Sequence, residues 1–168
     1  MFFASDNAGP IHPEVLDALS RVNEGYAMPY GADAGMDRVR AQIRDIFEAP
    51  DAMVHLVATG TAANSIALAC MCQPYETMFC SKVAHIHEDE CNAPEFYAGG
   101  AKLTIVPCDV DKMLPDDLRA SIAAEGIRGV HGPQRGAVSI TQVAEKGSVH
   151  TLDELQALVN VAKEFDLP

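Results

Sequence analysis

Residues 54–71 hold the feature that most restricts the fold of this chain, a strand that turns directly into a helix. Residues 54–58 form a short apolar run of the kind that makes a buried strand. Thr59, Gly60 and Thr61 interrupt that run, and residues 62–71 are rich in good helix formers. We therefore predict a buried strand over 54–58 that leads into a helix.

The turn at residues 59–61 also has the chemistry of a phosphate-binding site. The first turn of a helix has backbone N–H groups without partners, and it lies at the positive end of the helix dipole. Gly60 lets the backbone approach an anion, and the hydroxyl of Thr59 or Thr61 can donate a further hydrogen bond. The alternative is an ordinary strand, turn and helix in which a threonine caps the helix.

The whole chain alternates between strand-like and helix-like segments. Further strands are predicted over residues 76–81, 103–106 and 137–141. Helices are predicted from Pro13, from Met36 to a stop at Pro50, over 87–98 with an interruption or a start near Pro94, over 116–124, and after a capping box at Thr151 and Glu154. Such alternation predicts an α/β fold, a mostly parallel sheet flanked by helices on both faces.

Composition limits the compartment and the partners. The 168 residues suffice for one domain core, and 48% of them are hydrophobic. A formal net charge of −12 argues against nucleic acid or an anionic membrane as a partner. Five cysteines without a Cys-x-x-Cys pair fit a reducing, cytoplasmic compartment. We expect no signal peptide, because the N-terminus lacks a basic segment and a long apolar stretch, and no membrane-spanning segment.

The densest cluster of functional side chains is found at residues 85–91, and three interpretations are open. One is a metal site formed by His85, His87, Glu90 and Cys91, although this spacing matches no zinc signature and we expect no metal. Another is a solvated acidic helix start at Glu88, Asp89 and Glu90. In the third, His85 follows a parallel strand at the sheet edge where α/β folds bind ligands, and its imidazole stacks on a planar ring.

Segments along the whole chain match one family in order. The most specific are residues 59–64 (Thr-Gly-Thr-Ala-Ala-Asn) and 84–86 (Ala-His-Ile). The others are residues 5–7 (Ser-Asp-Asn), 30–33 (Tyr-Gly-Ala-Asp), 89–91 (Asp-Glu-Cys), 99–103 (Gly-Gly-Ala-Lys-Leu) and 139–142 (Ser-Ile-Thr-Gln). Together these segments resemble the low-specificity L-threonine aldolases, which are pyridoxal-phosphate enzymes of fold-type I, the aspartate aminotransferase fold.

The resemblance implies a cofactor, pyridoxal 5'-phosphate, and residues that bind it. Gly60 and Thr61 match positions that hold the cofactor phosphate, and Asn64 belongs to the same motif. His85 matches the imidazole that stacks on the pyridine ring and assists proton movement in catalysis. In many relatives Glu-Asn-Thr-His stands at residues 141–144 and a tyrosine at Asp89, so the identity of the catalytic base stays open.

The resemblance also implies a substrate and an assembly. The reaction would cleave L-threonine or L-allo-threonine, both β-hydroxy amino acids, to glycine and an aldehyde. Ser5 matches a side chain that contacts the substrate carboxylate, and Tyr30 belongs to a loop that lines the site, partly at a subunit boundary. The intact protein would be a homo-oligomer, a dimer or a tetramer.

By the same resemblance, residues 1–168 are the N-terminal part of an incomplete fold-type I large domain. Residues 1–50 would supply N-terminal helices and a loop, and residues 51–168 the alternating β/α units. The family's Asp-Gly-Ala-Arg segment is absent, and none of the five lysines matches the lysine that anchors the cofactor. We expect this chain alone to hold no covalent cofactor and to be inactive. A non-catalytic remnant and another fold-type I enzyme, such as a β-eliminating lyase, are the alternatives.

Overall fold

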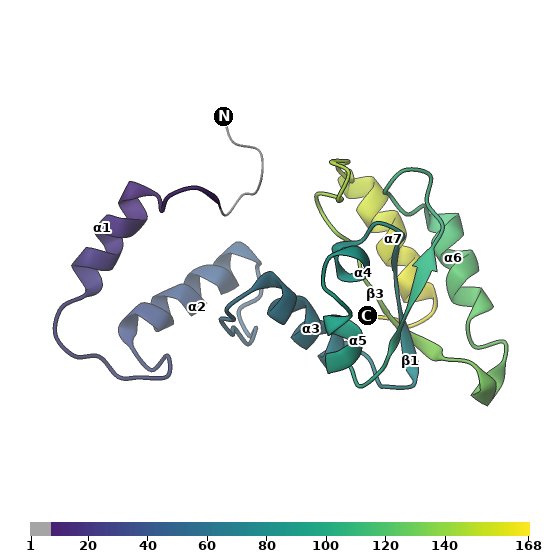
Figure 1. Ribbon diagram of the computed structural model, residues 1–168, viewed down its shortest axis with the longest axis horizontal. Coiled ribbons are helices and arrows are strands. Elements are labelled where there is room, and N and C mark those ends of the chain that lie inside the picture. The colour runs from purple at the N-terminus through teal and green to yellow at the C-terminus, as the bar shows by residue number, and fades with distance from the viewer. Residues whose placement is uncertain (1–7) are drawn as a thin grey trace. The chain divides into compact units, whose positions relative to one another are not determined.

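The computed structural model describes residues 8–168, and the chain divides into two compact units at His55 and Leu56 (Figure 1). Ser5, one of the two predicted substrate-binding residues, lies outside the described residues. In the part of the chain that is described, no helix is both long enough and apolar enough to cross a membrane.

The first unit contains two helices, α1 (Pro13–Val22) and α2 (Ala34–Ile46). Pro13 begins α1, as predicted, because a proline in the first turn loses no helical hydrogen bond. The second helix ends before the predicted stop at Pro50, since Glu48 has the left-handed φ of 51°. Neither helix contains a buried residue.

The centre of the second unit is a parallel sheet of three strands in the order β2-β1-β3. These strands are β1 (Glu76–Ser81), β2 (Lys102–Val106) and β3 (Gln134–Val138). The first strand matches the predicted range, and the second begins one residue earlier than predicted. The third begins and ends before the predicted 137–141, so its first half is polar.

The polar start of β3 has a structural cause in Arg135. Its guanidinium donates hydrogen bonds to the carbonyl oxygens of Ile122 and Glu125, at 2.8 and 3.0 Å, where α6 (Pro115–Ala124) ends. The same group lies over the ring of Phe165, 5.1 Å from its centroid. Arg135 is therefore a strand residue whose charged side chain caps the end of α6. A search for apolar runs does not detect such a strand residue. A single 3-10 turn, η2 (Gly129–His131), precedes the strand.

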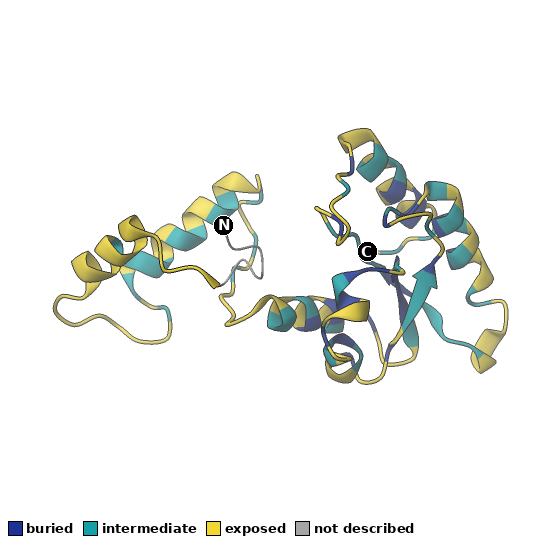
Figure 2. Cartoon of the chain, turned by 45° about the horizontal axis from the view of Figure 1, so that its top comes forward, coloured by how far each residue is buried: buried dark blue, intermediate teal, exposed yellow. Residues whose placement is uncertain are grey.

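Helices cover both faces of the sheet, as predicted, so the second unit has an α/β fold (Figures 1 and 2). One core contains Leu68 of α3 (Gly60–Met71) together with Met78 of β1. The other contains Phe79 of β1 with side chains of α6 and α7 (Leu152–Glu164). Met78 and Phe79 belong to different cores because successive side chains of a strand point to opposite faces.

The helix predicted over residues 87–98 is two short helices, α4 (His85–Glu88) and α5 (Ala93–Tyr97). Cys91 and Asn92 separate them with φ angles of 51° and 60°, which a right-handed helix cannot include. The interruption thus precedes Pro94, near which the sequence predicted it.

The buried strand predicted at residues 54–58 is wrong for this structure. The segment has no regular secondary structure and is largely exposed, and the side chains of Leu56 and Val57 are 66% and 42% exposed. A strand requires a neighbour for its backbone hydrogen bonds. Within residues 8–168, the three strands of the sheet pair with one another and none pairs with this segment.

The capping box predicted at the start of α7 is present and is reinforced by a lysine. The hydroxyl of Thr151 accepts a hydrogen bond from the N–H of Glu154 at 3.2 Å, and a Glu154 oxygen accepts one from the N–H of Thr151 at 2.7 Å. Lys112 donates to both oxygens of Glu154 at 2.7 Å. The hydrogen bond from Lys112, followed by those of Thr151, lowers the pKa of Glu154 to about 2.

The helix α3 meets the sheet through an unusually close contact. The thiol sulfur of Cys72 accepts a hydrogen bond from the N–H of Ala137 at 3.2 Å. A side chain at Gly136 would place its Cβ 2.8 Å from that sulfur and 2.8 Å from the carbonyl oxygen of Thr77. Glycine is therefore required at this point of β3, because any larger residue would separate the helix from the sheet.

Candidate functional site

The candidate site lies at the edge of the sheet where the parallel strands have their carboxyl ends. Since β1 and β3 are parallel neighbours, the segments after Ser81 and after Val138 leave the sheet at the same edge. His85 begins α4 in the first of these segments. Open α/β sheets bind ligands at this edge.

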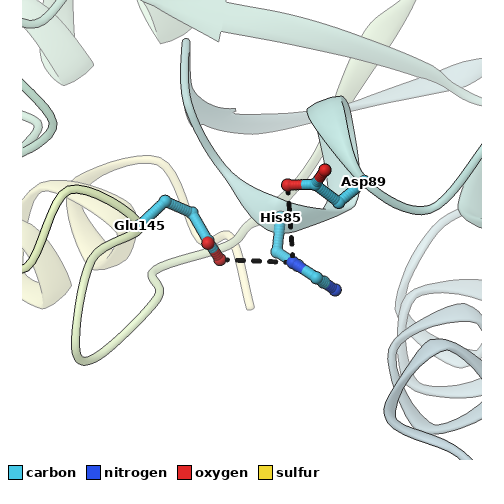
Figure 3. A group of neighbouring side chains, drawn as sticks. All are labelled: His85, Asp89 and Glu145. Atoms are coloured by element: carbon cyan, nitrogen blue, oxygen red, sulfur yellow. Dashed lines mark ion pairs between the residues drawn. The ribbon is translucent and has the colours of Figure 1, made fainter. Parts of the chain in front are cut away.

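Carboxylates surround the His85 imidazole. Its Nδ1 atom lies 3.3 Å from a Glu145 oxygen and 3.8 Å from an Asp89 oxygen (Figure 3). Its Nε2 atom lies 3.8 Å from an oxygen of Glu90. Both ring nitrogens therefore face negative charge when these acids are ionised, while the side chain stays 45% exposed. Such a ring can be reached by a ligand and can exchange protons with neighbouring groups.

Glu90 connects His85 to the helix that carries the predicted phosphate site. Its side chain is fully buried, and one of its oxygens accepts a hydrogen bond from the amide of Asn64, on α3, at 2.8 Å. The interpretation of residues 88–90 as a solvated acidic helix start is thus wrong for Glu90, although Glu88 and Asp89 are exposed. Asn64 directs its amide nitrogen to Glu90, so a direct contact of Asn64 with a cofactor stays a prediction.

The predicted metal ligands do not form a cluster in the described part of the chain. The group whose ligand atoms come within 4.8 Å of one another is His85, Asp89 and Glu145. His87, Glu90 and Cys91 are not part of it. We assign no metal to this group, because two of its members are exposed carboxylates, and exposed acidic groups are common without a metal ion.

The N-terminus of α3 has the free donors that the sequence predicted. Thr59 caps the helix, because its hydroxyl accepts a hydrogen bond from the N–H of Ala62 at 3.1 Å. The N–H groups of Gly60 and Thr61 have no hydrogen-bond partner among residues 8–168. A Cβ at Gly60 would meet no atom within 4 Å, so the space beside it is open. The helix cap and the free donors are therefore both present.

The start of α3 borders an open pocket of about 470 Å³ between α3 and α5. Its lining includes Thr59 and Thr61 from the start of α3, and Ala93 and Tyr97 from α5. The hydroxyl of Ser65, a buried residue that also lines the pocket, has no partner in the described structure. A ligand in this pocket would find several hydrogen-bond donors and some apolar surface.

The loop that carries Glu145 is held in place by hydrogen bonds of two side chains, those of Gln142 and Asp111. The side chain of Gln142 donates to the carbonyl of His150 at 3.0 Å and accepts from its N–H at 2.9 Å. Asp111 accepts a hydrogen bond from the N–H of Ser148 at 3.3 Å, and the bonds from Ser148 hold its pKa below the ordinary value. Glu145 was not predicted, because only the pairing of β1 with β3 brings its loop to His85.

Tyr30 belongs to the first unit. It has a φ of 60°, and its side chain is fully exposed. A non-glycine residue in this left-handed conformation is uncommon, and such residues gather in turns and at functional sites. The substrate-binding roles of Tyr30 and Ser5 stay predictions.

The comparisons with known proteins identify a family for this chain. The family model of the beta-eliminating lyases matches residues 3–168. This chain belongs to the beta-eliminating lyase family. Membership accounts for the α/β architecture of the second unit.

Within the beta-eliminating lyases, the relatives found here are threonine aldolases. The chain is 41% identical over 165 residues to a low specificity L-threonine aldolase of Pseudomonas aeruginosa and 40% identical to another from Pseudomonas sp.. It covers 47% of each, so it spans about half the length of these relatives. The threonine aldolase of Leishmania major matches 95% of this chain at 29% identity, with a TM-score of 0.88, and 46% of that chain is covered.

Proposed function

We propose that the protein containing this chain is a pyridoxal-phosphate-dependent lyase that cleaves L-threonine and L-allo-threonine to glycine and acetaldehyde. The proposal is supported by the identity to two low specificity L-threonine aldolases over 98% of the chain. The observation that carries it is the free N-terminus of α3 beside an open pocket. We further propose that the chain is the N-terminal part of a fold-type I large domain and acts in the cytoplasm as a homo-oligomer.

The start of α3 fits the phosphate of the cofactor. Gly60 and Thr61 contribute two free N–H groups, and Thr61 adds a hydroxyl next to the open space at Gly60. The positive end of the helix dipole stabilises the anion further. When bound, pyridoxal phosphate supplies the electron-withdrawing ring that such a carbon–carbon cleavage needs. Asn64 supports this end of the helix through its hydrogen bond to Glu90.

His85 contributes a planar ring and a proton-exchanging group. Its side chain is 45% exposed, and a ligand ring that reaches it could stack on the imidazole. Glu145, at 3.3 Å from Nδ1, holds a proton on that atom or accepts it, so that the imidazole gains or loses a proton beside the substrate hydroxyl. By the family resemblance, Ser5 would bind the substrate carboxylate, and Tyr30 would belong to a loop that lines a site, partly at a subunit boundary.

The test uses the full-length protein, loaded with pyridoxal phosphate and supplied with L-threonine or L-allo-threonine. Glycine and acetaldehyde are expected in equal amounts, and His85→Asn is expected to lower kcat by roughly 10²- to 10⁴-fold. The control is Glu88→Gln, a change in an exposed carboxylate of the same short helix. Release of ammonia and a 2-oxo acid in place of an aldehyde would indicate an eliminating lyase, and no turnover of either kind would favour a non-catalytic protein.

A further inference from the structure

We infer that Glu90 is a positioning residue, which fixes the His85 imidazole relative to the phosphate-binding end of α3. The inference deepens the proposed function, because His85 and α3 are the two parts of the site that must act on one cofactor. Glu90 itself touches neither the substrate nor the cofactor in this assignment. It acts through His85.

The first argument is the burial of Glu90. Its side chain is fully buried and has one hydrogen bond, from the amide of Asn64 at 2.8 Å. Its second oxygen, Oε2, has no partner within the described residues. A buried carboxylate with so few partners weakens a fold, and an apolar side chain of similar volume would often do as well. Packing alone therefore does not explain a glutamate at this position.

The second argument is the position of Glu90 between two functional elements. Its Oε1 atom accepts the hydrogen bond from Asn64 on α3 and lies 3.8 Å from Nε2 of His85 on α4. One oxygen atom thus faces both elements. When Glu90 is ionised, its negative charge favours a proton on the nearby Nε2 atom.

The third argument is the backbone that turns Glu90 inward. Cys91 and Asn92 follow it with left-handed φ angles of 51° and 60°. Two consecutive non-glycine residues in this region carry a conformational cost, which the surrounding structure must offset. A continuous helix would avoid that cost. The turn instead carries Glu90 into the interior beneath His85.

The carboxylates near the two nitrogens of His85 differ in their exposure to solvent. Glu145 and Asp89 approach Nδ1, and both are exposed to solvent, which screens them. Glu90 is the carboxylate that approaches Nε2, and it is shielded from solvent. Removal of the Glu90 charge is therefore expected to change which nitrogen of the ring carries the proton.

The experiment measures the imidazole nitrogens of His85 directly. Full-length apoprotein labelled with ¹⁵N-histidine is studied by NMR, and the His85 signals are assigned by their loss in His85→Gln. In Glu90→Gln, whose amide oxygen can still accept the hydrogen bond from Asn64, we expect the two ¹⁵N shifts to move toward an altered tautomer ratio. In the control Glu88→Gln they are expected to match the unmodified protein.

Kinetics provide the second measurement, on the same variants loaded with cofactor. Glu90→Gln is expected to lower kcat for L-threonine at least tenfold, with KM changed less than twofold, because ring orientation matters most during bond cleavage. Glu90→Met, which fills a similar volume without charge, repeats the test if the amide variant is unstable. Unchanged His85 nitrogen shifts in folded Glu90→Gln or Glu90→Met would overturn the inference. The NMR result needs no turnover, so it is independent of failure of the proposed reaction.

Discussion

Replacement of Gly60 is expected to change the affinity for the cofactor without changing the stability of the fold. A Cβ at this position meets no protein atom within 4 Å, and its φ is not left-handed, so alanine fits the fold. The added methyl group would occupy space that we assign to the phosphate. Gly60→Ala is therefore expected to leave stability unchanged and to weaken pyridoxal phosphate binding about tenfold, a loss of about 1.4 kcal/mol.

Cofactor affinity is measured by fluorescence titration of the full-length apoprotein. The matched control is Ala67→Gly, an exposed position in the same helix. This change costs the helix about 1 kcal/mol but leaves the anion site intact, so affinity is expected to stay the same. Equal affinities in Gly60→Ala and the unmodified protein would remove Gly60 from the site.

Some residues of the candidate site were predicted from the sequence, and others were not. Gly60, Thr61 and His85 were predicted from local patterns, a Thr-Gly-Thr helix start and a short motif, and their roles stay predictions. Glu90 was assigned to solvent, since three consecutive acids indicate an exposed segment and burial depends on the later turn at Cys91. Glu145 gave no signal, because its contact with His85 exists only once β1 and β3 are paired.

At the scale of elements, α7 is expected to weaken in acid through Glu154. The pKa of Glu154 in the folded chain is about 2, below its ordinary 4.5. A depressed pKa contributes stability above pH 4.5, and that contribution is lost as the pH falls from 4.5 through 2. Protection of the α7 amides against hydrogen exchange is therefore expected to fall across this range.

Glu154→Gln isolates this contribution. Protection of α7 at neutral pH is expected to fall several-fold, and the loss between pH 4.5 and 2 is expected to become smaller, because the pair with Lys112 is gone. Asp153→Asn, an exposed change in the same first turn, serves as the comparison. An acid dependence as steep as that of the unmodified protein would assign the effect to another carboxylate.

Elements with their own local signals were predicted well, and those that depend on distant partners were not. β1, β2, α6 and the capping box of α7 follow from apolar periodicity and cap residues. The range of β3 was shifted because Arg135 is a strand residue that caps α6. The segment 54–58 has the composition of a strand, but pairing also needs a neighbour, and no described strand supplies one.

At the scale of the whole molecule, exposed apolar side chains predict self-association of the 168-residue chain expressed alone. Val15, Leu16, Leu19 and Val22 of α1 are 49% to 69% exposed, and Leu56 is 66% exposed. Apolar surface of this kind associates in water. Light scattering after size-exclusion chromatography is expected to give species heavier than the 18.0 kDa monomer.

A variant tests whether α1 is responsible. Leu16→Lys combined with Leu19→Lys places charges on the apolar stripe and is expected to reduce the associated fraction. Ser20→Lys, on the same helix, adds a charge at a position outside that stripe and is the comparison. A monodisperse monomer of the unmodified chain would contradict the prediction.

The cysteines of this chain can report when α3 separates from the sheet, because some are exposed and others are buried beside the contact between them. Cys70 and Cys91 are exposed, whereas burial raises the pKa of Cys72 and raises that of Cys80 to about 12. An alkylating reagent is therefore expected to modify Cys70 and Cys91 first, the half-buried Cys108 later, and Cys72 and Cys80 only after α3 has separated from the sheet. The delay between these steps, read by mass spectrometry, times the separation of α3 from the sheet without any added label.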